Sequence, residues 1–388
     1  LSSSSAASDV YKRQFTRSVG GNLLFGSLPD SVRSRMQERL KELRDRHNLR
    51  ANITAGLGAV FVAIADRFIR PGGRIALVLP EALLNGIAWG PTRELLQQRY
   101  ELEHVIVSHQ PDRWNFSENT SLSEVLVVAR RHTGSTRPRK RKAASPATFV
   151  NLWQNPRNSV EALAVSSELA RRSSSVPDKG SQISVARLQT ERTVIAETVA
   201  VAPALACQHP LFYGAAFAQA SLIRVLYQVA SGALSVAGEK KQRALPMRPL
   251  GDIARSFGPD VRDIRDGFDL GPGRTSYAAF WGHSTDRVTT VAQDVNAHLS
   301  PLTEPRPGRN LRDAALLWET SGRLMLAERL RLNKARVVMA SLPRPALSNS
   351  WWPIALSDGD LVREREHALS LWMNSTLGLM LLLAARTE

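Results

Sequence analysis

The segment Pro71-Gly72-Gly73, followed by the apolar run at residues 74–79, constrains the fold more than any other part of the sequence. A proline followed by glycine is typical of a tight turn whose second central residue needs a positive φ. The run after the turn is apolar at nearly every position, as in a strand that is covered on both faces. An apolar stripe at residues 55–69 predicts a helix in front of the turn. Helix, turn and buried strand together predict an α/β fold.

The alternation of helices and strands continues along the chain. The pattern predicts a helix at residues 92–100 and strands at residues 102–108 and 122–129. Residues 133–146 are basic and rich in proline and serine, which is typical of a linker, so we expect a domain boundary after residue 146. Residues 1–14 show no periodicity, and we expect them to be a non-native or disordered tail.

The charge indicates a polyanionic partner. The formal net charge is +16, and 43 of the 51 basic residues are arginine. A charge of this size favours nucleic acid first and an anionic membrane surface second, and the arginine fork suits phosphate and guanine better than lysine does. A GC-rich genome also explains the preference for arginine, but it does not remove the charge.

The remaining composition favours a reducing compartment. A single cysteine, Cys207, excludes a disulfide framework within the chain. The longest apolar run, residues 377–385, is shorter than the roughly 18–20 residues of a membrane span. We therefore expect a cytoplasmic protein without a membrane partner. The eight histidines show no spacing typical of metal ligands.

The order of these elements resembles the adenine-specific (N6) DNA methyltransferases. The helix, the turn, the strand and Pro80-Glu81-Ala82-Leu83-Leu84 are similar to that family's helix, turn and fifth strand. The segment from Phe116 through residue 128 resembles the part that leads into the family's seventh strand and borders the pocket for the flipped base. The resemblance implies the back half of a Rossmann-like methyltransferase sheet at residues 15–146. It also implies a mixed α+β target-recognition region at residues 147–388.

The resemblance also implies the roles of individual residues. In that family an Asn-Pro-Pro-(Tyr/Phe) motif holds the adenine amino group and stacks on the flipped base. Phe15 resembles the aromatic residue of this motif, although Gln14 stands where the second proline would be. We expect Phe15 to stack on the base, and we expect DNA contacts from the following residues: Arg17, Arg113, Trp114, Asn119, Arg331, Lys334, Trp351 and Trp352.

The expected function follows from the same resemblance. It implies a site-specific methyltransferase of a restriction-modification or defence system, with S-adenosylmethionine as donor, double-stranded DNA as acceptor, and restriction or specificity subunits as possible partners. The expected donor-binding glycines and the Asn-Pro-Pro residues precede the matched segment. We therefore expect a fragment that is catalytically inactive by itself, and we assign no donor-binding residue.

Two alternatives stay open at this point. Enzymes with an Asn-Pro-Pro-aromatic motif also methylate RNA bases or protein glutamine, and the matched residues do not separate these substrates. A non-enzymatic DNA-binding module, such as a specificity subunit, would carry the same charge. Residues upstream of Phe15 would discriminate between enzyme and binder.

Overall fold

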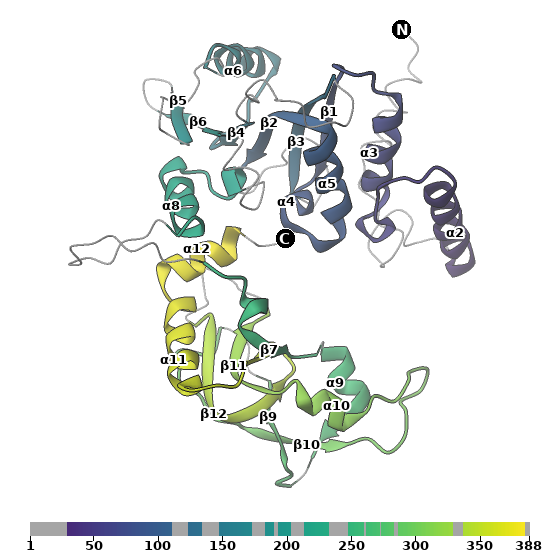
Figure 1. The fold of residues 1–388 in the computed structure, drawn as a ribbon, viewed down its shortest axis with the longest axis vertical. Coiled ribbons are helices and arrows are strands. Elements are labelled where there is room, and N and C mark those ends of the chain that lie inside the picture. The colour runs from purple at the N-terminus through teal and green to yellow at the C-terminus, as the bar shows by residue number, and fades with distance from the viewer. Residues whose placement is uncertain are drawn as a thin grey trace, which may run out of the picture. The chain divides into compact units, whose positions relative to one another are not determined.

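The structure is a computed structural model that describes residues 29–110, 123–133, 147–172, 183–189, 193–202, 213–232, 247–259, 261–271, 273–282, 286–328 and 337–384. The chain divides into two compact units (Figure 1). Unit 1 consists of residues 1–231 and 383–388, and unit 2 of residues 232–382.

Unit 1 contains a six-stranded mixed sheet in the order β1-β3-β2-β4-β6-β5. Its strands are β1 (Arg74–Pro80), β2 (Tyr100–Ser108), β3 (Glu124–Arg131), β4 (Ala147–Leu152), β5 (Ile183–Gln189) and β6 (Val194–Val201). β3 runs antiparallel to both β1 and β2, so β1 and β2 run in the same direction. β4 is parallel to β2, and β5 and β6 form an antiparallel pair at the far side. The expected α/β class is confirmed.

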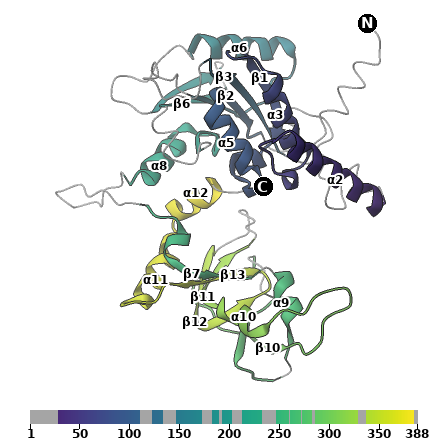
Figure 2. The same ribbon diagram turned by 45° about the vertical axis from the view of Figure 1, so that its right-hand side comes forward.

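Helices cover both faces of this sheet (Figure 2). The helices of unit 1 are α2 (Asp30–Arg46), α3 (Leu57–Phe68), α4 (Ala82–Asn85), α5 (Gly90–Arg99), α6 (Ser159–Arg172) and α8 (Ala220–Ala230), with short 3₁₀ turns η1 (Ile53–Ala55), η2 (Ile87–Trp89) and η3 (Tyr213–Ala215). Side chains alternate between the two faces of a strand. Val150 accordingly packs with Leu169 of α6, whereas Phe149 belongs to the core cluster that contains Val60 of α3 and Ile223 of α8. The result is a three-layer helix–sheet–helix unit.

The turn before β1 has the geometry that its sequence predicts. Gly72 has φ 77°, and the amide of Gly73 donates to the carbonyl of Arg70 at 2.9 Å, as in a type II turn. The turn is joined to the end of β3, because the Gly72 amide donates to the Arg131 carbonyl and the Arg131 amide donates to the Gly73 carbonyl. The predicted helix, turn and strand are confirmed, and the turn also anchors β3.

Replacing Gly72 by alanine is expected to lower the free energy of unfolding of unit 1 by about 1–2 kcal/mol. The alanine would have to adopt the positive φ of this position. Its Cβ would lie 3.1 Å from Cγ2 of Thr133. Denaturant unfolding measures the change. Gly90→Ala is the matched control, since Gly90 has a helical backbone and open space around its Cα. Equal stability of the two variants would contradict the expectation.

An ion-pair ladder crosses three strands near the turn. Arg74 of β1 lies opposite Arg130 of β3, and these like charges would repel. Both guanidinium groups donate to the Glu103 carboxylate of β2, each through Nε at 2.8 Å. Burial acts to raise the pKa of Glu103, but the two arginines outweigh it, so the pKa is lowered. The ladder thus favours the register of β1, β3 and β2 at this edge.

The sheet of unit 1 extends beyond the expected domain boundary. β4 pairs in parallel with β2 over five residues. The expected boundary after residue 146 therefore falls, along the sequence, between β3 and β4, which belong to one sheet. The division between the units falls instead between Ser231 and Gly232. The segment 134–146, whose composition suggested a linker, lies outside the described residues. The assignment of catalysis and target recognition to separate parts of the chain stays a prediction.

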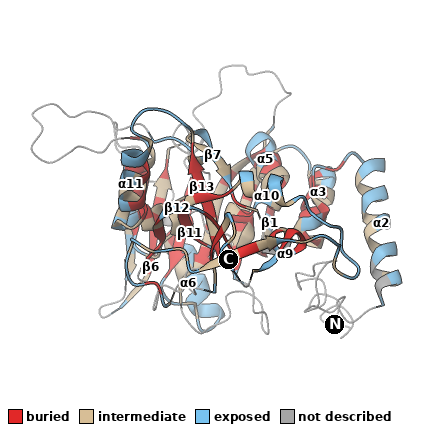
Figure 3. Cartoon of the chain, turned by 90° about the horizontal axis from the view of Figure 1, so that it is seen from below, coloured by how far each residue is buried: buried red, intermediate tan, exposed pale blue. Residues whose placement is uncertain are grey.

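Unit 2 contains a seven-stranded sheet in the order β7-β13-β11-β12-β9-β10-β8. Its strands are β7 (Ala254–Phe257), β8 (Phe268–Leu270), β9 (Tyr277–Phe280), β10 (Ala297–Pro301), β11 (Gly322–Ala327), β12 (Met339–Ser348) and β13 (Trp351–Leu356). Its helices are α9 (Val261–Gly267), α10 (Ala314–Glu319), α11 (Val362–Met373) and α12 (Thr376–Ala384), the last of which ends in residues of unit 1, and η4 (Leu250–Asp252) is a 3₁₀ turn. Its central strands β11 to β13 are the most buried part, whereas α2 of unit 1 is largely exposed (Figure 3).

No single helix in the described part of the chain has the length and apolar character of a membrane span. Helices α11 and α12 satisfy those criteria only when they are taken together, and they are bent by 73° at their junction.

Candidate functional site

The carboxyl ends of the parallel strands identify one edge of the unit 1 sheet as the candidate site. In open α/β sheets, ligands bind outside the carboxyl ends of the strands. Here those ends are Pro80 of β1, Ser108 of β2, Leu152 of β4 and Gln189 of β5, because these four strands run in the same direction. We call this the carboxyl edge.

A buried amide organises the carboxyl edge after β2 and β4. Asn151 is fully buried, and its Nδ2 donates to the carbonyl of Gly214 at 2.9 Å. Its Oδ1 therefore faces Nε2 of His109 at 3.0 Å. An amide oxygen only accepts, so Nε2 of His109 carries the proton in this pair. The backbone amide of His109 also donates to the carbonyl of Leu152, which ties the two strand ends together.

A second buried polar group supports the same region from β6. Glu197 is 2% exposed, and its Oε2 accepts a hydrogen bond of 2.6 Å from the amide of Ala220, the first residue of α8. Arg187 of β5 donates to its Oε1 through Nε and Nη2 at 2.9 and 2.7 Å. A carboxylate at a helix N-terminus satisfies an amide that lacks a partner inside the helix. Glu197 therefore fixes α8 against the strands that carry Asn151.

The loop after β1 is held by an arginine. Arg93 of α5 donates to the carbonyls of Leu83 and Gly86 at 2.9 and 2.7 Å. Burial lowers the pKa of Arg93, although Glu94 opposes the shift. Beside this clamp, the Ile87 side chain is 91% exposed, which is unusual for so large an apolar residue. The carboxyl edge thus combines a rigid loop, an exposed apolar side chain and hydrogen-bonding groups.

The polar groups at this edge include a carboxylate, that of Glu124, which is fully buried opposite Pro80 at the start of β3. They also include the imidazole of His109 and the amide of Gln110, whose Oε1 accepts from the amide of Asn155 at 2.7 Å. Among the described residues, no group of three or more histidine, cysteine, aspartate or glutamate side chains could hold a metal ion. The imidazole and the amide provide hydrogen bonding at this edge, and Ile87 provides apolar contact.

Most of the predicted site residues lie outside the described residues. These are Phe15, Arg17, Arg113, Trp114, Asn119, Arg331 and Lys334. Three of them, at positions 113, 114 and 119, belong to the segment between Gln110 and Ser123, and both flanking residues lie at the carboxyl edge. The Ser123 carbonyl accepts a hydrogen bond of 2.8 Å from the amide of Glu81, directly after β1.

The two predicted tryptophans lie in β13 of unit 2. Trp351 is 2% exposed, and its ring packs edge-to-face against Phe280 with centroids 5.8 Å apart. Its burial makes it a core residue, so we do not include it in the proposed DNA surface. Trp352 is partly exposed and points to the opposite face of the strand. A DNA contact by Trp352 stays a prediction.

Sequence reasoning missed the buried polar residues of the carboxyl edge. Asn151 and Glu197 each interrupt an apolar run, and polar residues in buried strands need partners. The interruption of an apolar run by a polar residue therefore indicates a buried side chain that needs a hydrogen-bond partner. The partners of these side chains, His109, Gly214 and Ala220, lie 23 to 63 residues away along the chain, so the sequence pattern did not reveal them.

No family model and no curated protein matches the chain. Among solved structures, the chain is similar to one described as the type IIG restriction endonuclease BpuSI, with 11% sequence identity and a TM-score of 0.33. The match covers 91% of this chain and 42% of that protein. A similarity at this level carries no conclusion about function.

Proposed function

We propose that this chain functions in site-specific methyl transfer from S-adenosylmethionine to N6 of adenine in double-stranded DNA. The identity of donor and acceptor rests on the sequence resemblance. The carboxyl edge of unit 1 is the surface to which we assign the target base. Restriction or specificity subunits are the protein partners that the same resemblance implies.

One observation carries this proposal. The two segments that resemble the family's fifth and seventh strands are β1 and β3, and they pair directly over seven residues from Arg74 to Pro80. β2, which lies between them in sequence, is displaced to the other side of β3. A simple repeat of strand, helix and strand would give parallel neighbours. The pairing also brings Pro80 and Glu124 together at the carboxyl edge, which supports the assignment of the target base to this edge.

The position of the loop after β2 supports the assignment of the surface. The segment 111–122 contains three of the residues predicted to contact DNA, and the described residues that flank it, Gln110 and Ser123, lie at the carboxyl edge. Arginine and tryptophan are the residue types that contact phosphates and stack on bases. The net charge of +16 favours the same partner.

DNA binding that weakens steeply with salt is the expected result for the purified chain. Each neutralised phosphate contributes about −0.9 to the slope of log affinity against log salt concentration. We expect Arg113→Gln to reduce this slope by about one unit, while the matched control Arg39→Gln on α2 leaves it unchanged. Fluorescence anisotropy with a labelled duplex between 50 and 200 mM salt, a range suited to such slopes, provides the measurement. A flat salt dependence would contradict the proposal.

A second duplex distinguishes an enzyme from a simple binder. A base that is already unpaired saves the few kcal/mol needed to extrude it from the helix. A protein that accepts a flipped adenine should therefore bind a duplex with a mismatched adenine more tightly than the fully paired duplex. Equal affinity for the two would favour a non-enzymatic DNA-binding module. Tighter binding to an RNA duplex of the same sequence would favour methylation of RNA.

A further inference from the structure

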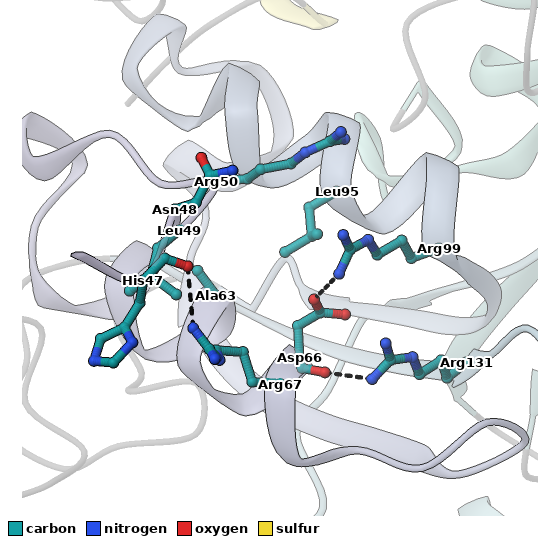
Figure 4. A pocket seen from close by; sticks show the side chains of 10 residues that line it. All are labelled: His47, Asn48, Leu49, Arg50, Ala63, Asp66, Arg67, Leu95, Arg99 and Arg131. Atoms are coloured by element: carbon teal, nitrogen blue, oxygen red, sulfur yellow. Dashed lines mark hydrogen bonds and ion pairs between the residues drawn. The ribbon is translucent and has the colours of Figure 1, made fainter. Parts of the chain in front are cut away.

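Unit 1 has a pocket of about 400 Å³, drawn in Figure 4. It lies at the edge of the sheet opposite to the candidate site. Asp66 and Arg67 near the end of α3, Arg99 at the end of α5 and Arg131 at the end of β3 line it. These ends meet near the amino ends of β1 and β2. β1 has seven residues, so at about 3.3 Å per residue the two edges lie roughly 23 Å apart. The pocket is therefore separate from the proposed DNA surface.

The turn after α2 forms one wall of the pocket. Asn48 has φ 46°, the left-handed conformation that asparagine tolerates. The amide of Asn48 donates to the carbonyl of Asp45, and the amide of Leu49 donates to that of Arg44, as in a Schellman motif. This turn buries Leu49 in the core and sets Arg50 on the rim. The wall is thus fixed by backbone hydrogen bonds.

The pocket is lined by an excess of positive charge. Four arginines, Arg50, Arg67, Arg99 and Arg131, line it together with a single carboxylate, that of Asp66. Asp66 is 4% exposed and is already engaged, because it pairs with Arg99 and accepts a hydrogen bond of 3.0 Å from the Tyr100 hydroxyl. Asp66 therefore holds Arg99 in place and leaves the other guanidinium charges uncompensated.

Neutral acceptors hold the other three arginines. Arg67 donates through Nη1 to the carbonyl of His47 at 3.1 Å, and Arg50 donates to the side-chain oxygen of Gln98. Arg131 donates to the carbonyls of Asp66 and Ile69. Within the described part of the chain, none of these three forms an ion pair with a carboxylate. Each guanidinium keeps further N–H donors in a fixed fork, which matches the oxygens of a phosphate.

The floor of the pocket is apolar and the volume exceeds that of a simple ion. Ala63 and Leu95 are 3% and 2% exposed and belong to the core beneath the arginines. Pockets for organic ligands typically range from about 300 to 1,000 Å³, with an apolar lining and a few placed polar groups. The volume of about 400 Å³ suits a ligand that carries a small organic group beside its charge.

We propose that this pocket binds a phosphate-bearing small molecule of about the size of a mononucleotide. Its phosphate would lie among Arg50, Arg67 and Arg99, and its apolar part would lie on Ala63 and Leu95. The inference is independent of the proposed function, because it concerns a different edge of the sheet. A nucleotide and inorganic phosphate would both present a phosphate group to these arginines, so both serve as probes.

Isothermal titration calorimetry with the full chain tests the pocket. The probes are deoxyadenosine 5′-monophosphate, the nucleoside deoxyadenosine and inorganic phosphate. We expect the nucleotide to bind, and the nucleoside to bind at least about tenfold more weakly, since charge-assisted hydrogen bonds carry the recognition. Measurable binding of inorganic phosphate alone would also support the proposal and would identify the free anion as sufficient.

Three substitutions at two positions test the residues without disturbing the core. Arg50 and Arg67 are exposed at the rim, so Arg50→Gln and Arg67→Gln should leave the thermal unfolding midpoint nearly unchanged. Each should weaken nucleotide binding roughly tenfold, and Arg67→Lys should give an intermediate loss because it keeps the charge but not the fork. The matched control is Arg224→Gln. Arg224 is an exposed arginine on α8, a helix that contacts β6 and does not line the pocket.

Three results would overturn the proposal. The first is no detectable binding of either phosphate probe. The second is equal binding of nucleoside and nucleotide, which would show that the base alone is recognised. The third is a loss of duplex affinity in Arg67→Gln with unchanged nucleotide affinity, which would assign the pocket to the DNA surface.

Discussion

Replacing Gly322 by alanine is expected to lower the free energy of unfolding of unit 2 by about 3 kcal/mol or more, the upper range for overpacking. The added Cβ would lie 2.3, 2.4 and 2.7 Å from the carbonyl oxygen, carbonyl carbon and amide nitrogen of Ile354. Ile354 is fully buried in β13, the strand between β7 and β11. Backbone atoms in the middle of a sheet cannot move aside without breaking hydrogen bonds to two neighbours.

Denaturant unfolding followed by tryptophan fluorescence measures this effect, because five of the eight tryptophans belong to unit 2. Gly251→Ala is the matched control in the same unit, since nothing lies within 4 Å of its added Cβ. We expect the control to stay within about 0.5 kcal/mol of the unchanged chain. A Gly322→Ala variant as stable as the control would show that β11 and β13 are not paired in this register.

Replacing Glu197 by alanine is expected to cost unit 1 about 2–4 kcal/mol. The change removes the acceptor of the Ala220 amide, which is buried, and an unsatisfied buried donor costs about 1–3 kcal/mol. It also removes the partner of Arg187, but that arginine is 54% exposed and water can solvate it. The larger part of the loss therefore belongs to the helix cap and the smaller part to the ion pair.

A double-mutant cycle with Arg187→Ala separates the two contributions. We expect a coupling energy of about 1 kcal/mol or less between Arg187 and Glu197, because one partner is exposed. Hydrogen exchange of the amides of α8 provides a local readout, and these amides should exchange faster in Glu197→Ala. Unchanged exchange in α8 together with a loss below about 1 kcal/mol would contradict the role of Glu197 as a cap.

The first half of unit 1 could be predicted from sequence because its pattern is local. The apolar stripe of α3, the turn at Gly72 and the apolar runs of β1, β2 and β3 each specify an element through neighbouring residues. Buried elements of this kind leave a strong periodic signal. Their boundaries differ from the expected ones by about two residues, as is usual for element ends.

The extent of unit 1 could not be predicted in the same way. Composition indicated a boundary at residues 133–146, but β4 returns to pair with β2. Strand pairing is a long-range property, and nothing in the sequence of β4 specifies its partner. The same limit applies to Trp351. A tryptophan near basic residues has the same local sequence whether it faces the core or the solvent, and only the alternation within β13 decides.

The pocket lined by arginines was also beyond sequence reasoning. Its four arginines come from the turn after α2 and from the ends of α3, α5 and β3, and more than 80 residues separate the first from the last. The local sequence around each of them does not distinguish it from the other arginines of this basic chain. Only the meeting of the element ends at one edge of the sheet makes them a group.

The place of β3 between β1 and β2 has a consequence for synthesis of the chain. β1 and β2 leave the ribosome first, yet neither pairs with the other, and both wait for residues 124–131. During that interval two apolar strands expose unpaired edges, which favours association between nascent chains. A pause in translation before residues 124–131 emerge from the ribosome should therefore promote aggregation, whereas a pause after they have emerged should not, because the three-stranded segment can then close.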